Sequence, residues 1–369
     1  MHTFIPVSKP SIGEKEVAYV VDSVRSGWVS SLGPYIENFE KQFAAYCGTR
    51  FALTTSNGTT GLHLALVASG VVAGDEVIVP DLTFVATANA VAYIGATPVL
   101  VDVDSETLCI SPDSIRRAIT PRTRAIVPVH LYGHPADMDE INSVAKKHGL
   151  VVIEDAAEAH GAEYNGKRVG SLGLCGVFSF YGNKVITTGE GGMITTNDEN
   201  LYHTAKRLRD HAMSPTRRYW HEEIGFNYRM TNMQAALGLA QLEQIDEFIA
   251  MRRVIMGWYC DRLASHPRLR LNRNAPWAKN VYWMICVEAA GLTDTTRQEL
   301  MTALRERGVD SRPYFYPVSD MPVFLGAETP VTHCYSRIGL NLPSYVGITE
   351  QEVDFVCRVF VALLDGTAE

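Results

Sequence analysis

The sequence has little charge and no excess of basic residues. Of its 369 residues, 20% are charged, and 33 Lys and Arg stand against 41 Asp and Glu, which gives a formal net charge of -8. This balance disfavours non-specific binding to nucleic acid or to an anionic membrane. A localised basic cleft for an anionic small molecule remains compatible with it. The 46% of hydrophobic residues can fill a large core, which excludes a disordered chain.

Paired cysteines and targeting segments are also missing. The seven cysteines are scattered, odd in number and contain no C-x-x-C motif, which favours reduced thiols in a cytosolic protein. The first thirty residues contain six charged side chains and two prolines, so they lack the apolar core of a signal peptide. The long uncharged run Leu82–Val101 contains Thr, Asn, Gly and Pro and reads as a buried helix, a turn and a buried strand. We expect a cytoplasmic protein that binds neither nucleic acid nor membrane.

The common nucleotide and metal fingerprints are absent. There is no G-x-x-x-x-G-K-[ST] and no G-x-G-x-x-G, so neither a nucleoside triphosphate site nor a Rossmann site is expected. His130, His134 and Asp137 could be drawn as metal ligands. Gly133 and Pro135 break the helix that ligation by residues four apart would need, so the segment favours a turn. No metal site is predicted.

Short apolar runs alternate with amphipathic segments from about residue 50 onward. This alternation predicts an α/β fold built on a large, mainly parallel sheet. The expected strands are Phe51–Thr55, Glu76–Val79, Pro98–Asp102, Ala125–His130, Val151–Glu154, Gly176–Phe180 and Gly192–Thr196. The expected helices are Thr59–Ala68, Thr83–Ile94, Pro112–Ile119, Met138–His148 and Asn200–Arg209.

A long helix-favouring stretch, Asn232–Ala264, follows this region. The segments after it read as a smaller α+β unit, with a strand near Val281–Val287, a helix near Thr296–Arg307 and a Pro-bearing loop at Arg312–Pro322. No long linker separates the two parts. We therefore predict a large domain, 1–245, packed closely against a small C-terminal domain, 246–369.

Carboxylates follow the apolar run VVIEDAAEA, residues 151–159. Glu154 and Asp155 end this predicted strand, and Glu158 lies three residues further on. Open α/β sheets place ligand sites at the carboxyl ends of their strands. A helix-capping aspartate explains the same pattern, so both interpretations remain open here.

A lysine without a nearby carboxylate follows the predicted strand Gly176–Phe180. Lys184 lies among uncharged residues and precedes the turn GEGG, in which Glu190 is the first acidic residue. A desolvated lysine has a lowered pKa, which suits Schiff-base chemistry. The aromatic strand and the tight turn favour a buried setting, although a lone lysine is usually solvated.

Small and hydroxylated residues lead from a strand directly into a helix in TTSNGTTGLHLAL, residues 54–66. The free N–H groups at this helix start, with the hydroxyls of Ser56, Thr59 and Thr60, can form a phosphate cup. Ordinary N-capping is the alternative interpretation. Together with Phe84, the three segments supply what a pyridoxal phosphate enzyme needs: a phosphate cup, an aromatic ring, an acid for the ring nitrogen and a lysine for the aldehyde.

Three stretches carry a resemblance to a known family. EDAAEAHGAEYNGKRVGSLG, FSFYGNKVITTGEGGMITTND and IGFNYRMTNMQAALGLAQL closely resemble the DegT/StrS family of nucleotide-sugar aminotransferases, and the likeness extends over nearly the whole chain. It implies the aspartate aminotransferase-like fold, PLP fold type I. It also implies pyridoxal 5'-phosphate as cofactor, with pyridoxamine 5'-phosphate as the form that carries the amine.

The resemblance also implies roles for individual residues. Lys184 and Asp155 are the catalytic residues, which bind the cofactor's aldehyde and pair with its ring nitrogen, and Phe84 stacks on the ring. The phosphate contacts are expected from Ser56, Gly58, Thr59 and Ser179, and from Asn227 of the neighbouring subunit in a homodimer whose active sites are shared. Glu158 lies near the ring oxygen, where many members have Gln. A branch with histidine in place of the lysine dehydrates sugars, and Lys184 argues against that branch.

The substrates implied by the resemblance are L-glutamate and a nucleotide-linked 4-keto-6-deoxy sugar. RRYWHEEIGFNYRMTN and SRPYFYP are most similar to the perosamine-type members, which aminate C4 of GDP-4-keto-6-deoxy-D-mannose for bacterial O-antigen or antibiotic glycosylation. Trp220, His221, Tyr314 and Tyr316 are candidate sugar contacts, with interface packing as the alternative. A UDP- or dTDP-linked sugar is the alternative acceptor.

A hypothesis of another class is a non-catalytic regulator that binds the cofactor or a nucleotide sugar. Fold alone permits it, but a sensor needs no intact lysine and aspartate. His160 is expected to be a core histidine, with orientation of the site as the alternative. Arg229 is expected to be an interface or structural arginine, with binding of a substrate phosphate as the alternative.

Overall fold

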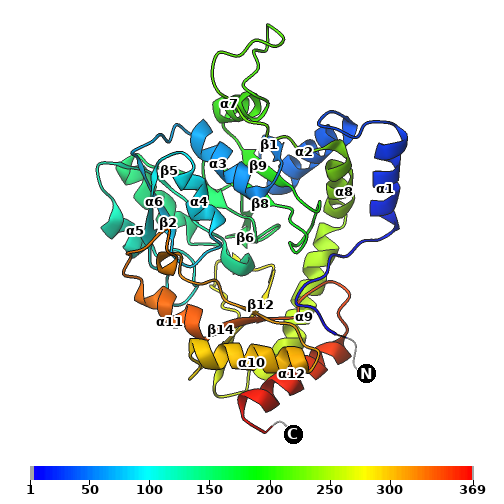
Figure 1. Cartoon of the computed structure of the whole chain (residues 1–369), viewed down its shortest axis with the longest axis vertical. Coiled ribbons are helices and arrows are strands. Elements are labelled where there is room, and N and C mark those ends of the chain that lie inside the picture. The colour runs from blue at the N-terminus through cyan, green and yellow to red at the C-terminus, as the bar shows by residue number, and fades with distance from the viewer. Residues whose placement is uncertain (1–3, 368–369) are drawn as a thin grey trace.

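The computed structural model describes residues 4–367 and is built around a seven-stranded sheet (Figure 1). The strand order is β1-β9-β8-β5-β4-β2-β3. The bounds are β1 Phe51–Thr55, β2 Glu76–Pro80, β3 Thr97–Val101, β4 Thr123–Ile126, β5 Val151–Asp155, β8 Cys175–Ser179 and β9 Gly192–Thr196. Strand β9 is antiparallel to both of its neighbours, and the other pairs are parallel. The predicted large, mainly parallel sheet is confirmed.

Helices cover both faces of this sheet. The first face carries α3 Gly58–Ala68, α4 Ala86–Ala92 and α7 Glu199–Arg209. The second carries α2 Pro34–Cys47, α5 Pro112–Ala118 and α6 Met138–His148, with α8 Asn232–Leu242 and α1 Glu14–Arg25 outside α2. In β5, consecutive Val152 and Ile153 belong to the cores of opposite faces. A sheet covered on both sides needs strands that are apolar throughout, which is why these strands were readable as apolar runs.

A second, four-stranded sheet has the order β10-β12-β14-β13 and a core of its own. Its strands are β10 Leu269–Leu271, β12 Ile285–Ala289, β13 Arg312–Pro313 and β14 Gly339–Leu342, and its helices are α10 Asp294–Glu306, α11 Pro330–Ile338 and α12 Glu350–Leu364. A small sheet of β6 Glu163–Tyr164, β7 Lys167–Arg168 and β11 Ala278–Lys279 joins the two parts, and the short turns are η1 Leu131–Gly133 and η2 Val318–Asp320.

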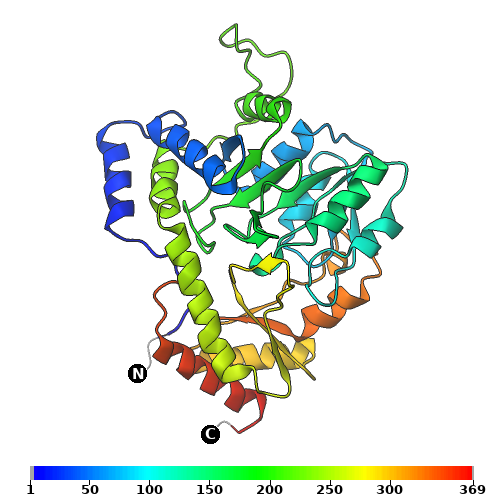
Figure 2. The same ribbon diagram turned by 180° about the vertical axis from the view of Figure 1, so that it is seen from behind.

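The long helix α9, Ile245–Leu263, runs from one core to the other (Figure 2). Its Ile249 packs in the core of the large sheet and its Ile255 in the core of the small sheet. Near the start of the chain, Ile5 forms a bridge with Val309 and also packs in the second core. The division at residue 245 therefore stays a prediction, and the small unit includes residues from the start of the chain.

The helix-favouring stretch Asn232–Ala264 is helical but forms two helices rather than one. It breaks at Glu243 and Gln244 into α8 and α9. The side-chain amides of Gln241 and Gln244 both donate to Glu16 Oε1 of α1, each at 2.7 Å. The buried Glu16 carboxylate thus fixes the chain at the break, which no local pattern around residue 243 indicates. The two helices before residue 50, α1 and α2, were not predicted.

Three other predicted elements are shorter or shifted. Strand β4 ends at Ile126 rather than His130, because Pro128 has no N–H to continue the ladder. The strand expected at Val281–Val287 begins at Ile285, after Asn280 Oδ1 accepts the N–H of Tyr282 in a turn. The helix expected at Thr83–Ile94 spans Ala86–Ala92. Strand β3, expected to be buried, is a half-buried edge strand.

Two aspartates at neighbouring strand ends hold the second part against the first. Asp81, which follows β2, accepts hydrogen bonds from the Ser319 N–H at 2.7 Å, the Ser319 hydroxyl at 2.8 Å and the Thr329 hydroxyl. Asp102, which follows β3, accepts from the N–H groups of Val331 and Thr332 at 2.9 and 2.8 Å. Asp102 thereby caps the first turn of α11. We call this pair, Asp81 and Asp102 with their donors, the aspartate clasp.

Within residues 4–367, none of the helices has the length and apolar character that crossing a membrane requires.

Candidate active site

A cavity of about 480 Å³ opens where the carboxyl ends of β5 and β8 meet the start of α3. This is the edge at which open α/β sheets bind ligands. Seven of the predicted site residues line it: Gly58, Thr59, Phe84, Asp155, Glu158, Ser179 and Lys184. The structure therefore brings together residues that are up to 126 positions apart in the sequence, counted from Gly58 to Lys184.

Asp155 is buried in this cavity, with 5% of its surface exposed. Its Oδ2 accepts the Thr87 hydroxyl at 2.8 Å, and its Oδ1 accepts the Ala157 N–H at 3.2 Å. Burial raises the pKa of Asp155, and the Thr87 hydrogen bond and the charge of Lys184 act in the opposite direction. A buried carboxylate held in this way can pair with a cationic ring nitrogen.

Lys184 lies between a carboxylate and an indole. Its Nζ is 3.7 Å from Glu158 Oε1 and 3.8 Å from the centre of the Trp283 ring. Burial lowers the pKa of Lys184, and Glu158 and Asp155 oppose this. Burial likewise raises the pKa of Glu158 to about 7, although the charge of Lys184 opposes the rise. Lys184 can thus lose its proton more readily than a surface lysine, as a nucleophile and proton carrier must.

The shifted pKa of Glu158 predicts how the stability of the cofactor-free chain depends on pH. Between about pH 4.5 and 7, folded Glu158 keeps a proton that unfolded glutamate releases, so the free energy of unfolding falls as pH rises through this range. The variant Glu158→Gln should lose this dependence on pH. The total decrease in the free energy of unfolding across the range is a few kcal/mol at most, since one pKa unit corresponds to about 1.4 kcal/mol. Urea unfolding at pH 5 and pH 7 measures it.

The control for this prediction is Glu247→Gln, which changes an exposed glutamate on α9. It should keep the wild-type slope. Equal slopes in wild type and Glu158→Gln would contradict the burial of a protonated Glu158.

The start of α3 has free N–H groups where the sequence predicts a phosphate cup. The Asn57 side chain caps the helix by accepting the Thr60 N–H at 2.8 Å. Within the described chain, no hydrogen bond is formed by the N–H groups of Gly58 and Thr59, which remain available to an anion. A Cβ on Gly58 would lie 2.8 Å from Ser179 Cβ, so glycine is required for the close approach of these two segments. The cup fits a phosphate group.

Ser56 lies beside the cup rather than in the cavity wall. Its hydroxyl is 3.0 Å from that of Thr60, and its N–H donates to the Tyr228 carbonyl. Asn227, the residue expected from a neighbouring subunit, also lies outside the cavity of its own chain. Its Oδ1 accepts from Arg229 Nε at 3.1 Å, and Arg229 forms an ion pair with Asp210 at 2.6 Å.

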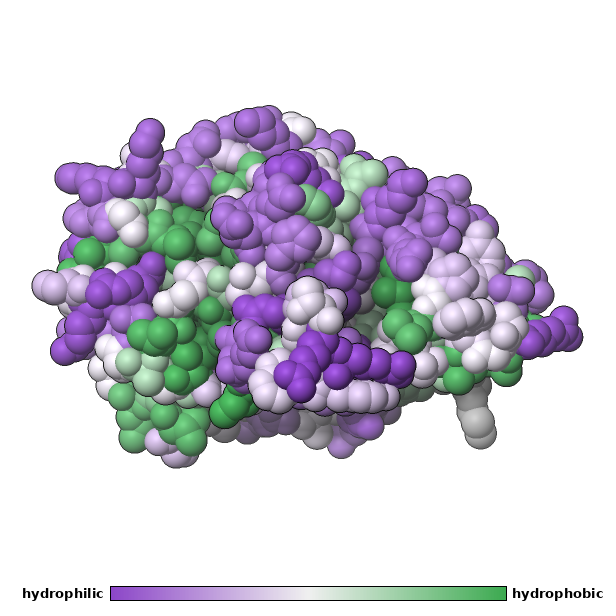
Figure 3. Space-filling view, turned by 90° about the horizontal axis from the view of Figure 1, so that it is seen from above, coloured by the Kyte–Doolittle hydropathy of each residue, from purple (hydrophilic) through white to green (hydrophobic). Residues whose placement is uncertain are grey.

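Trp220 and His221 lie on a projecting segment, 213–224, which we call the arm and which extends beyond α7 (Figure 1). Trp220 is 45% exposed, and Arg217 lies 4.0 Å from its ring centre. The end of the molecule that carries the arm is largely hydrophilic with separate apolar patches (Figure 3). The arm does not line the cavity of its own chain. Its side chains are available to a neighbouring molecule.

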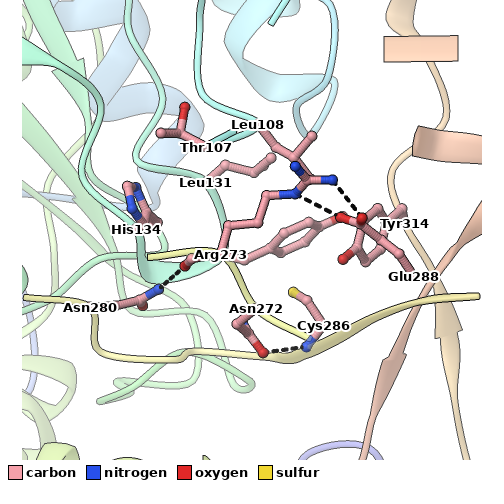
Figure 4. Close-up of a pocket in the computed structure, with 11 residues that line it drawn as sticks. Thr107, Leu108, Leu131, His134, Asn272, Arg273, Asn280, Cys286, Glu288 and Tyr314 are labelled. Carbon is pink, nitrogen blue, oxygen red and sulfur yellow. Dashed lines mark hydrogen bonds and ion pairs between the residues drawn. The ribbon is translucent and has the colours of Figure 1, made fainter. Parts of the chain in front are cut away.

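Tyr314 and Tyr316 also lie outside the cavity, for different reasons. Tyr314 is fully buried and lines a separate space of about 20 Å³ beside the Arg273–Glu288 ion pair (Figure 4). Its ring packs 5.1 Å from that of Tyr132, so the structure places it in the core and away from a sugar in the larger cavity. Tyr316 is exposed beside Arg297.

Several residues of the cavity wall were missed from the sequence. They are Thr87, Asn183, Trp283, Arg312 and Phe315. Arg312 and Phe315 belong to the SRPYFYP segment, whose tyrosines were chosen instead. Trp283 comes from the second part of the chain, and its indole N–H donates to the Asn183 carbonyl beside Lys184 at 2.7 Å. Nothing in the local pattern around Trp283 indicates this contact.

The residues that could be drawn as metal ligands have protein partners instead. His130 Nε2 is 3.0 Å from Glu154 Oε2, and His134 Nε2 accepts the Ala275 N–H at 2.9 Å. The segment between the two histidines is the short turn η1, as predicted. Glu154 also accepts three loop N–H groups, so it is structural. His160 is fully buried, which lowers its pKa to about 3 and keeps it neutral.

Comparison with known proteins places this cavity in a family. The family model of the DegT/DnrJ/EryC1/StrS aminotransferases matches residues 10–361. The chain belongs to this aminotransferase family. It is 50% identical to the GDP-perosamine synthase of Caulobacter vibrioides over 97% of each chain, and 45% identical to that of Escherichia coli O157:H7 over 96% of this chain and 97% of the other.

A solved structure agrees with this membership. The structure is similar to that of a Streptococcus pneumoniae protein named as a sugar aminotransferase, solved in its PMP form. The TM-score is 0.94 at 27% identity, and the match covers 99% of this chain and 98% of the other. The same protein has been solved in its PLP form. The fold is PLP fold type I, and the chain is a pyridoxal phosphate-dependent aminotransferase. The phosphate cup, the buried Asp155 and the desolvated Lys184 fit that cofactor.

Proposed function

We propose that this aminotransferase transfers the amino group of L-glutamate to C4 of GDP-4-keto-6-deoxy-D-mannose and so produces GDP-perosamine. The observation that carries the proposal is the 40–50% identity, over at least 96% of this chain, to three proteins named GDP-perosamine synthase. The cavity has the charges and donors that such a reaction needs. An O-antigen or antibiotic sugar pathway would use the product.

Each group of the cavity has a task in this reaction. Bound pyridoxal phosphate supplies the electron sink that stabilises negative charge at the reacting carbon. Asp155 would hold positive charge at the ring nitrogen, and the Gly58 and Thr59 N–H groups with the Ser179 hydroxyl would hold the phosphate. Lys184 Nζ would take the proton from the α-carbon of the amino donor as a general base and deliver it, as a general acid, to the carbon from which the amine has to be released. Glu158 and Trp283 hold Lys184 in place.

Absorption spectroscopy of the purified, cofactor-loaded protein tests the proposal. L-Glutamate should abolish the near-visible band of the bound cofactor, and GDP-4-keto-6-deoxy-D-mannose should restore it. Restoration by a UDP- or dTDP-linked keto sugar instead would assign a different acceptor. A band that ignores every amino donor would contradict an enzyme and favour a binding regulator.

We also propose that the enzyme is a homodimer whose two active sites each contain residues of both chains. Asn227 and the arm support this, because neither reaches the cavity of its own chain. The exposed Trp220 and Ile224, 45% and 90% accessible, give the arm apolar side chains to bury against a second copy.

A further inference from the structure

Asp155 ends a row of three buried polar side chains. The Thr87 hydroxyl donates to Asp155 Oδ2 at 2.8 Å, and the Thr83 hydroxyl lies 3.0 Å from that of Thr87. Both threonines are 1% exposed. They are four residues apart where the chain turns into α4, so their hydroxyls meet on one side. Thr87 lines the cavity, and Thr83 does so beside it.

The direction of the hydrogen bonds in the row depends on the charge state of Asp155. A hydroxyl has a single proton to donate, and Thr87 has three acceptors within reach: Asp155 Oδ2, the Thr83 hydroxyl and the Phe84 carbonyl at 3.2 Å. An ionised carboxylate can only accept, so Thr87 must donate to it and can then accept from Thr83. A protonated carboxyl can donate to Thr87, which then turns its own proton to the Phe84 carbonyl or to the Thr83 hydroxyl.

We propose that Thr87, with Thr83 behind it, is a positioning residue that keeps Asp155 ionised and directed at the ring nitrogen of the cofactor. The inference deepens the function proposed above and rests on it. A charged group buried in the cavity gains more from a donor than an exposed one does. The arrangement in which Thr83 donates to Thr87 and Thr87 to Asp155 is the one that stabilises the charged form.

Among the residues that the structure describes, the other groups around Asp155 act on it through charge or through a main-chain N–H, and not through a side-chain hydroxyl. Lys184 and His130 act on it through charge and lower its pKa, and burial raises it. Glu158 is the other carboxylate that interacts with it. The Ala157 N–H holds the second oxygen, Oδ1. Thr87 is therefore the side-chain hydroxyl that bonds the carboxylate directly, and its role can be separated from that of the neighbouring charges.

Replacing the hydroxyl by a methyl group tests the proposal. Thr87→Val should raise the Kd for pyridoxal phosphate by about tenfold, because a hydrogen bond to a charged group is lost. The acidic limb of the pH profile of kcat should move up by about one pH unit. Thr87→Ser should restore both quantities. Thr83→Val should shift both in the same direction but less.

Thr196→Val is the matched control. It removes a buried threonine hydroxyl that donates to the Leu174 carbonyl at 2.7 Å, away from the cavity. It should lower Tm without changing Kd or the pH profile. If Thr87→Val changes Tm alone, or if Ser and Val behave alike, the positioning role is wrong. Failure of the proposed function would look different, because wild-type protein itself would then bind no pyridoxal phosphate or exchange no amino group.

Discussion

Replacing Lys184 by alanine is expected to abolish amino transfer and to leave the fold intact. Loss of general acid–base catalysis alone costs about 10²–10⁴-fold in rate, and the variant also loses the amine that we propose binds the cofactor's aldehyde. The fold should survive because Glu158, whose pKa is raised to about 7, can take up a proton when its cationic partner is gone. The measurement is the rate of amino transfer from L-glutamate, together with Tm.

Lys146→Ala is the control for this prediction, since it removes an exposed lysine of α6. It should behave as wild type. Retained amino transfer in Lys184→Ala would contradict the assignment of the catalytic lysine, and with it the order of roles in the cavity. A variant that no longer folds, by contrast, would show that the Lys184–Glu158 pair is needed for stability.

Mixing two inactive variants is expected to recover activity if the active sites are shared. In a dimer of one Lys184→Ala chain and one Asn227→Ala chain, one site carries both defects and the other carries none. Random exchange of subunits should therefore restore up to about a quarter of wild-type activity. The measurement compares the activity of the mixture, after subunit exchange, with the sum of the two variants measured alone.

A second mixture distinguishes shared sites from other causes of recovery. Lys184 and Asp155 line the same cavity of one chain. Lys184→Ala mixed with Asp155→Asn should stay inactive, because no combination of these chains contains an undamaged site. If the first mixture also shows no activity beyond the sum of its parts, Asn227 does not act across a dimer interface.

Much of the large sheet could be predicted because its strands are apolar on both sides. Helix α6 and strands β1 and β9 have the predicted bounds, β2 and β5 are one residue longer at one end, and β3 and β8 are shifted by one residue. Elements whose form depends on distant partners could not be predicted. The break between α8 and α9 depends on Glu16, more than 220 residues away in the sequence.

The same distinction applies to the site. Lys184, Asp155 and the phosphate cup each follow a strand or begin a helix, so the fold class predicts that they meet. Trp283 reaches Lys184 from the second part of the chain, and no spacing indicates that contact. Tyr314 is the opposite case, a residue that was predicted as a sugar contact and does not line the cavity. An aromatic residue in a segment that lines the cavity was chosen as a sugar contact, whereas its neighbour Phe315 is the one in the wall.

The aspartate clasp has a consequence for how the sequence can drift. Ser319, Val331 and Thr332 bond to the side chain of Asp81 or Asp102 through their main-chain N–H groups. A main-chain donor is supplied by every residue except proline. Substitutions at these three positions therefore keep a main-chain donor to each aspartate, although they can lose the hydroxyl bonds of Ser319 and Thr332. Replacing either aspartate removes the carboxylate that accepts all of its bonds. Over evolutionary time, the two aspartates of the large-sheet part should therefore vary less than the residues of the second part that donate to them.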